Sequence, residues 1–208
     1  MDFFAFDERA VELSHTYGLD ATYFECSLVT PSSKVASFST KAFEQVTGGK
    51  LELIYSLLKS GNDIVFIDAD IVFKKDPLPL ISELMSKSDL AFQIDGPAWI
   101  WERDKIMRNC CTGFIAIRST RKTMKLFDPS NGYGKFNEMD QDFIKRRLRE
   151  ECWKYEDIAL FPREYFPNGA FYYQFHKEIL DRVTIIHFNH VIGEKKIEKM
   201  KEHSCWYL

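Results

Sequence analysis

Residues 61–70 read GNDIVFIDAD, and the fold assignment starts from this stretch. Residues 64–67 form a short apolar run of β-branched and aromatic side chains. A helical pattern precedes the run and a proline-bounded turn follows it, so the run predicts a strand buried on both faces. Asp68 and Asp70 come directly after this strand, with the small Ala69 between them. At the carboxyl end of a parallel strand, side chains point into the crevice where α/β proteins bind ligands.

This Asp-x-Asp pair predicts a metal site. Two carboxylates so close together repel each other unless a hard cation lies between them. Mg²⁺ and Mn²⁺ prefer oxygen ligands and often bind substrate phosphates as well. The alternative interpretation is that Asp-x-Asp is a common tripeptide in a solvated turn. The rest of the chain has to decide between the two.

The composition favours one soluble α/β domain. The chain has 208 residues, of which 45% are hydrophobic and 15% aromatic, enough to bury a substantial core. The formal net charge is -3, with 28 basic and 31 acidic residues well mixed. A basic footprint for nucleic acid or for an anionic membrane is therefore absent from the sequence.

The cysteines and the apolar runs predict a cytoplasmic setting. The five cysteines are odd in number and lack CxxC spacing, which favours reduced thiols over a disulfide framework or a zinc site. No apolar run reaches the length of a membrane span, and the N-terminus lacks the basic region of a signal peptide. We therefore expect neither a signal peptide nor a membrane anchor.

Strand and helix patterns alternate along the chain. The expected strands cover residues 3–6, 21–26, 64–67, 71–73, 90–95, 112–117 and 183–186. The expected helices cover residues 7–17, 40–60, 77–85, 120–127 and 139–151, and a last helix follows Gly193. This alternation predicts an α/β fold of a single domain over residues 1–208, with a mostly parallel central sheet and helices on both faces.

Three further segments carry residues suited to a metal or a ligand. Residues 185–196 read IIHFNHVIGEKK, where an imidazole after a buried strand would complete a cation site and the following Gly, Lys and helix N-terminus would suit a diphosphate. Residues 139–142 read MDQD at the start of a helix, and residues 109–114 read NCCTGF, where a small pair lets a ligand approach the backbone. Each has an alternative interpretation: a structural histidine, ordinary acidity at a helix N-terminus, and a tight turn into a strand.

Taken in chain order, these segments resemble the nucleotide-diphospho-sugar transferases of the GT-A type. The resemblance rests on residues 50–61, Asp68-Ala69-Asp70, Asp76-Pro77, Gln93-Ile94-Asp95, Thr112-Gly113-Phe114, Asp140-Gln141-Asp142, Phe166-Pro167-Asn168-Gly169 and His187-Phe188-Asn189. It covers nearly the whole chain, and its specificity lies in the ordered set, because no single motif would suffice. The family's opening strand and helix, which help to hold the nucleotide base, are not matched, so we assign no base contacts.

The resemblance implies a GT-A-like fold and a metal-dependent glycosyltransferase. Such an enzyme moves a sugar from a nucleotide diphosphate, here a UDP-sugar, to an acceptor hydroxyl on a carbohydrate or glycan, with retention of the anomeric configuration favoured. The implied cofactor is Mn²⁺ (or Mg²⁺), held by Asp68, Asp70 and His187. Mechanistically, the metal and Lys196 would stabilise charge on the leaving diphosphate.

The resemblance also implies roles at the donor and in catalysis. The residues implied to bind the donor are Lys50, Asp68, Ala69, Thr112, Gly113, His190, Gly193 and Lys196. Asp95 would hold hydroxyls of the donor sugar, with Gln141 near the anomeric carbon and Asp140 facing the sugar or the acceptor. An inverting enzyme would instead need a carboxylate base, which Asp140 or Asp142 would supply.

The late histidine has two candidates. His187 matches the family by its position just after a strand, whereas His190 fits the spacing His-x-x-Gly-x-x-Lys with Gly193 and Lys196. We favour His187 as the metal ligand because the end of a strand is held more rigidly than the loop beyond it.

Aromatic residues predict an acceptor surface. Trp99 and Trp101 follow the expected strand 90–95 and its Asp95, and aromatic faces stack on sugar rings. Two rival functions stay open at this stage: a metal-dependent phosphodiesterase or nucleotidyltransferase, and a non-catalytic nucleotide-sugar-binding module.

Overall fold

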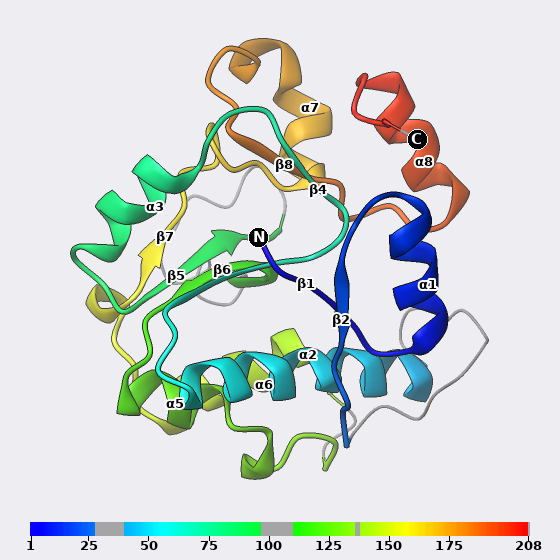
Figure 1. Ribbon diagram of the computed structural model, residues 1–208. Helices are drawn as coiled ribbons and strands as arrows, with labels where there is room; N and C mark the ends of the chain where they lie inside the picture. The colour runs from blue at the N-terminus through cyan, green and yellow to red at the C-terminus, as the bar shows by residue number, and fades with distance from the viewer. Residues whose placement is uncertain (28–39, 97–109, 136–137, 208) are drawn as a thin grey trace. The chain divides into compact units, whose positions relative to one another are not determined.

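A computed structural model describes residues 1–27, 40–96, 110–135 and 138–207 (Figure 1). The chain divides into two compact units. The first unit comprises Met1–Asn62 and Thr120–Leu148, and the second comprises Asp63–Ser119 and Arg149–Leu208.

The first unit begins with the predicted strand and helix. Strand β1 (Phe3–Ala5) pairs in parallel with β2 (Ala21–Tyr23), and helix α1 (Glu8–Thr16) connects them. The Asp7 carboxylate accepts a hydrogen bond from the Ala10 N–H at 2.8 Å, which satisfies one of the unpaired donors at the helix start. The strand–cap–helix pattern of the sequence is therefore confirmed.

The rest of the first unit is helical. Helix α2 (Lys41–Lys59) is N-capped by Thr40 and packs against α5 (Arg121–Phe127). The short helix η1 (Pro129–Asn131) and the helix α6 (Asp140–Glu150) follow α5 in the chain. Residues 40–60, 120–127 and 139–151 had been predicted as helices, and all three predictions are confirmed.

A mixed sheet forms the centre of the second unit. Its strands, in the order β3-β6-β5-β7, are β3 (Ile64–Ile67), β6 (Cys110–Ile117), β5 (Leu90–Ile94) and β7 (Ala159–Leu160). Strand β6 is antiparallel to both β3 and β5, whereas β5 and β7 are parallel. Strands β3, β5 and β7 therefore run in one direction, as expected for a mostly parallel sheet, and β6 runs against them. The apolar pattern of a strand carries no information on its direction, so the reversal of β6 was not predicted.

Strand β3 differs from its prediction in burial. Among the described residues, β3 is an edge strand of the sheet. Val65 is 40% exposed, and its neighbours on β3 are half-buried. The expectation of a strand buried on both faces is therefore wrong. A short apolar run has the same appearance in an edge strand and in a central one.

The second unit also contains a two-stranded sheet, which includes the predicted metal ligand His187. Strands β4 (Ile71–Phe73) and β8 (Ile185–His187) pair antiparallel, with Ile71 opposite His187. The remaining elements of this unit are α3 (Leu78–Met85), η2 (Tyr155–Asp157), α7 (Gly169–Ile179) and α8 (Glu194–Glu202). Neither helix α7 nor strand β7 was predicted, because β7 has only two residues and the aromatic residues of α7 suit a strand as well as a helix.

The sheet is backed by an aromatic core. Helix α3 packs on β5, β6 and β7. The rings of Phe114, Phe161 and Phe166 belong to the same core and contact one another in edge-on and tilted arrangements, with centroids 4.6 to 5.5 Å apart. This packing fixes the strand ends from which the site residues project. None of the five cysteines takes part in a disulfide. No helix among the described residues is both long and apolar enough to span a membrane.

Candidate metal and donor site

Three potential metal ligands meet at the ends of β3 and β8. Asp68 and Asp70 lie between β3 and β4, and His187 is the last residue of β8. The register of β4 on β8, with the Phe188 N–H donating to the Asp70 carbonyl at 3.0 Å, brings Asp70 beside His187. One ligand atom from each of the three residues lies within 4.8 Å of the other two. Residues at the ends of β3 and β8, which are far apart in the sequence, thus form one cluster.

Asp70 remains ionised in this cluster. Its Oδ1 lies 3.2 Å from His187 Nε2, and its Oδ2 lies 2.5 Å from Lys196 Nζ. Burial raises the pKa of Asp70, but the hydrogen bond from His187 and the charges of His187 and Lys196 outweigh it and hold the pKa well below its ordinary value. Asp70 therefore offers the cluster a full negative charge.

Gly113 leaves the space in which the ligands converge. It lies on β6, and its carbonyl accepts the Asp68 N–H at 2.8 Å. A Cβ at this position would lie 2.4 Å from Cε1 of His187 and 2.7 Å from Oδ2 of Asp68, both closer than atoms can approach. Only glycine is compatible with this arrangement. Two carboxylates and an imidazole nitrogen that converge where Gly113 has no side chain suit a divalent ion such as Mn²⁺.

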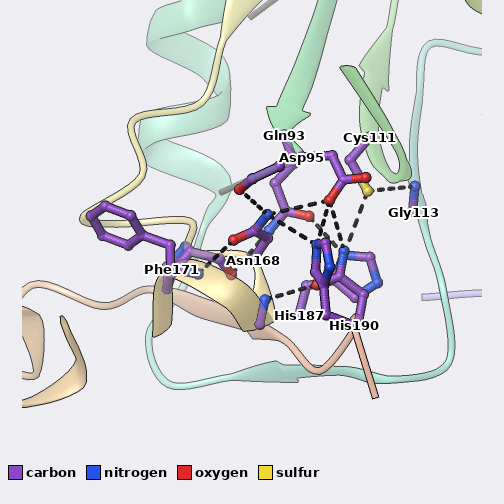
Figure 2. Close-up of polar contacts among 12 residues, drawn as sticks. Gln93, Asp95, Cys111, Gly113, Asn168, Phe171, His187 and His190 are labelled. Atoms are coloured by element: carbon purple, nitrogen blue, oxygen red, sulfur yellow. Dashed lines mark hydrogen bonds and ion pairs between the residues drawn. The ribbon is translucent and has the colours of Figure 1, made fainter. Parts of the chain in front are cut away.

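The ring of His187 is buried, and two side chains contact its Nδ1 (Figure 2). It is 3% exposed, and its Nδ1 lies 2.7 Å from Gln93 Oε1 and 3.7 Å from Cys111 Sγ. Gln93 and Cys111 were not among the predicted site residues, although Gln93 belongs to a motif of the resemblance. The sequence feature that could have indicated Gln93 is a glutamine within a predicted apolar strand, because a buried polar side chain needs a hydrogen-bond partner.

His190 belongs to a separate cluster around Asp95 (Figure 2). Asp95 Oδ1 accepts from His190 Nε2 at 2.8 Å, Asn168 Nδ2 at 3.2 Å and Asn189 Nδ2 at 3.3 Å. The hydrogen bond to Asp95 raises the pKa of His190, burial opposes this, and the charge of Asp95 adds to the rise. Of the two candidate histidines, His187 thus lies with Asp68 and Asp70, and His190 with Asp95.

Residues at the start of helix α7 form hydrogen bonds with the Asp95 cluster. Asn168 is fully buried and caps α7, with its Oδ1 accepting the Phe171 N–H at 2.9 Å. The Gly169 N–H donates to Asn189 Oδ1 at 2.7 Å, and a Cβ on Gly169 would lie 2.2 Å from the Asn189 carbonyl oxygen. Asn168 and Asn189 were not predicted as site residues, and an Asn-Gly pair before an aromatic helix was the available signal.

Helix α8 presents Lys196 to the metal ligands. Gly193 precedes the helix with φ 58° and ψ −139°, a conformation that side-chain-bearing residues rarely adopt. The Lys196 N–H donates to the Gly193 carbonyl at 3.0 Å in the first turn. Near the cluster, Thr112 is buried beside Gly113 on β6, and Ala69 is exposed between the two aspartates.

Lys50 and Asp140 form a buried ion pair in the first unit. Lys50 Nζ on α2 lies 2.7 Å from Asp140 Oδ2 at the start of α6, with side chains 10% and 8% exposed. Gln141 is half-buried at the next position. Of the predicted site residues, these three lie in the first unit and the others in the second. Trp99 and Trp101, the predicted acceptor residues, lie outside the described residues.

The comparison with protein families agrees with this geometry. A family model described as nucleotide-diphospho-sugar transferase matches residues 3–202. The chain belongs to this family. The match covers nearly the whole chain, as the ordered set of motifs had indicated.

Three relatives align over most of the chain. A UDP-galactose:fucoside alpha-3-galactosyltransferase of Dictyostelium discoideum is 26% identical over 200 residues, covering 85% of this chain and 30% of the relative. From Arabidopsis thaliana, a UDP-D-xylose:L-fucose alpha-1,3-D-xylosyltransferase 3 is 22% identical over 81% of this chain and 49% of the relative. The beta-arabinofuranosyltransferase RAY1 of the same plant is 24% identical over 97% of this chain and 41% of the relative. The chain therefore spans less than half the length of each of these relatives.

Two solved structures share the fold. A glycosyltransferase involved in the glycosylation of the major capsid of PBCV-1 matches with a TM-score of 0.52 at 10% identity, covering 92% of this chain and 88% of that chain. Mouse xyloside xylosyltransferase 1 also matches with a TM-score of 0.52, at 12% identity, covering 91% of this chain and 83% of that chain. The predicted GT-A-like α/β fold of the family is thereby confirmed.

Proposed function

We propose that the chain is a metal-dependent glycosyltransferase that moves a sugar from a UDP-sugar to a hydroxyl of a glycan. The observation that carries this proposal is the cluster of Asp68, Asp70 and His187 beside Lys196, in a member of the nucleotide-diphospho-sugar transferase family. The names of two relatives support the donor, because both specify a UDP-sugar.

Asp68, Asp70 and His187 are the proposed ligands of Mn²⁺ or Mg²⁺. Carboxylate oxygens suit both ions, and the imidazole nitrogen of His187 favours Mn²⁺ over Mg²⁺. When bound there, the ion would act as a Lewis acid toward the negative charge of the leaving diphosphate. The low pKa of Asp70 supports this role, since the ligand is already ionised.

Lys196 is the second proposed cation for the diphosphate. Its ammonium lies beside the metal ligands, and it projects from the first turn of α8, where a helix N-terminus also favours anions. Gly193 allows the turn that starts this helix. Ala69, Thr112 and Gly113 are proposed to line the donor at close backbone approach, because small residues surround the ligands there.

Three residues are proposed to act in catalysis, as the resemblance implies: Asp95, Asp140 and Gln141. In the second unit, Asp95 holds hydroxyls of the donor sugar, and His190 orients Asp95 through their 2.8 Å contact. In the first unit, Asp140 forms an ion pair with Lys50 at 2.7 Å and is proposed to face the sugar or the acceptor, with Gln141 near the anomeric carbon.

The names of the relatives also suggest which acceptor to test first. One relative acts on a fucoside and another on L-fucose, and both form alpha linkages. An alpha linkage made from an α-linked UDP-sugar is a retained configuration, which supports the proposal of a retaining mechanism. We therefore propose a fucose-containing glycan as the first acceptor to screen, with Trp99 and Trp101 as proposed stacking residues.

The test is a screen of donor turnover. UDP-, GDP- and dTDP-sugars are incubated with the chain in Mn²⁺ or in EDTA, and the released nucleotide and sugar are identified. The expected result is slow Mn²⁺-dependent release of UDP and free sugar, accelerated by a fucoside acceptor. Release of a sugar phosphate would instead indicate a phosphodiesterase, and binding without any turnover would indicate a non-catalytic binding module.

Matched aspartate variants complete this test. Asp70→Ala removes a proposed metal ligand, and turnover should fall to background. Asp63→Ala removes a carboxylate from the opposite end of β3, where Asp63 Oδ1 accepts the Ser119 N–H at 2.8 Å. This control should lower stability slightly and leave turnover intact. Equal activity of the Asp70→Ala protein would overturn the proposed site.

A further inference from the structure

Gln93 makes hydrogen bonds in two directions from the end of β5. The side chain is fully buried, on the strand next to β6 with its Gly113. Its Nε2 lies 3.1 Å from the carbonyl oxygens of both Phe166 and Pro167, and its Oε1 lies 2.7 Å from His187 Nδ1. Figure 2 shows the Gln93 amide beside the imidazole of His187, joined to it by this contact.

The two carbonyl groups determine which way the amide points. A carbonyl oxygen only accepts hydrogen bonds, so the atom of Gln93 that faces Phe166 and Pro167 must be the NH₂ group. The atom that faces His187 is therefore the amide oxygen, which also only accepts. It follows that Nδ1 of His187 carries the hydrogen of this 2.7 Å contact.

The position of that hydrogen decides the chemistry of the other ring nitrogen. With a hydrogen on Nδ1, the proton that a divalent ion would displace is the one that Nε2 donates to Asp70 Oδ1 at 3.2 Å, and its release leaves the lone pair of Nε2 for the ion. We propose that Gln93 is a positioning residue that fixes the tautomer and the ring orientation of His187 for a divalent ion. This inference rests on the proposed function, since it assumes that His187 is a metal ligand.

Cys111 does not provide an equivalent support. Its Sγ lies 3.7 Å from His187 Nδ1 and accepts the Gly113 N–H at 3.4 Å. Sulfur is a weak acceptor, and this contact is a full ångström longer than the one from Gln93. Gln93 is therefore the group expected to hold the hydrogen on Nδ1, and the sulfur fills the space beside it.

Two substitutions of Gln93 separate positioning from structural support. Gln93→Met and Gln93→Glu both remove the NH₂ donors to Phe166 and Pro167, so both should lower the melting temperature. Only Gln93→Glu keeps an oxygen that accepts from His187 Nδ1. Outer-shell partners of metal-binding histidines typically contribute about 10–100-fold to metal affinity, so Gln93→Met should weaken Mn²⁺ binding by this factor. Gln93→Glu should stay within about threefold of the wild type, since a carboxylate is a common partner of such histidines.

Calorimetric titration with MnCl₂, well below the melting temperature of each protein, measures these affinities. Phe92→Leu is the matched control, because Phe92 is the fully buried neighbour of Gln93 on β5 and pairs with Ile115, whereas Gln93 pairs with Cys111 beyond an irregularity in the register. This control should lose stability and keep wild-type Mn²⁺ affinity. Unchanged affinity in Gln93→Met, or equal losses in Gln93→Met and Gln93→Glu, would overturn the role of Gln93. Failure of the wild type to bind Mn²⁺ would instead overturn the proposed metal site itself.

Discussion

The substitution Gly113→Ala tests whether the proposed metal site requires the absence of a side chain at position 113 as well as the charged ligands. The added Cβ would lie 2.4 Å from Cε1 of His187 and 2.7 Å from Oδ2 of Asp68. Ordinary contacts of this kind start at 3.4 Å, so the imidazole and the carboxylate must each move by roughly 1 Å. His187 is buried, and its Nδ1 contacts Gln93 and Cys111, so the ring has little room to move.

The expected magnitudes follow from this displacement. Inserting a methyl group into a packed core costs about 1–3 kcal/mol, and each kcal/mol lowers the melting temperature of a chain of this size by about 2–4 °C. A ligand set displaced by about 1 Å no longer matches the coordination geometry, so Mn²⁺ affinity should fall at least about 100-fold, or roughly 2.7 kcal/mol.

The assay pairs calorimetry with thermal unfolding in EDTA. Ala116→Gly is the matched control, since it changes one methyl group at a buried position of the same strand, away from the cluster. It should lower stability by roughly 1 kcal/mol and leave Mn²⁺ affinity unchanged. A folded Gly113→Ala protein with wild-type Mn²⁺ affinity would refute the reasoning, because the ion would then bind elsewhere.

Three further outcomes are expected. Lys196→Gln removes an ammonium 2.5 Å from Asp70, so calorimetry should show tighter binding of Mn²⁺ alone, by roughly fivefold for about 1 kcal/mol, and weaker binding of UDP with Mn²⁺. The raised pKa of His190 beside Asp95 makes its contribution to stability complete below pH about 6.5 and lost as the pH rises through the raised value. The melting temperatures of the wild type and His190→Asn should therefore converge in alkaline buffer. Lys50→Met leaves a buried carboxylate without its lysine, and urea unfolding should show a loss of roughly 3 kcal/mol.

Parts of the candidate site could be predicted because their signals are local. Asp68 and Asp70 directly follow an apolar run, and His187 directly follows another, so each could be expected at a strand end. The structure brings these three side chains together through the pairing of β4 with β8. The choice of His187 over His190 rested on the rigidity of strand ends, and the two histidines do lie in different clusters.

Other features depend on contacts between distant segments. Gln93 meets His187 across 94 positions of sequence, and no local pattern indicates which buried glutamine will support a histidine. The pairing of Lys196 with Asp70 spans 126 positions and was likewise not foreseen. The reversed direction of β6 and the half-exposed face of β3 are properties of the sheet as a whole, which an apolar run does not encode.

Anomalous diffraction from crystals grown with MnCl₂ and UDP would test the central proposal most directly. The account predicts one manganese peak, coordinated by carboxylate oxygens of Asp68 and Asp70 and by Nε2 of His187, with the UDP diphosphate on the same ion. A manganese peak at the Asp95–His190 cluster, or a UDP diphosphate bound away from Asp68 and Asp70, would contradict it.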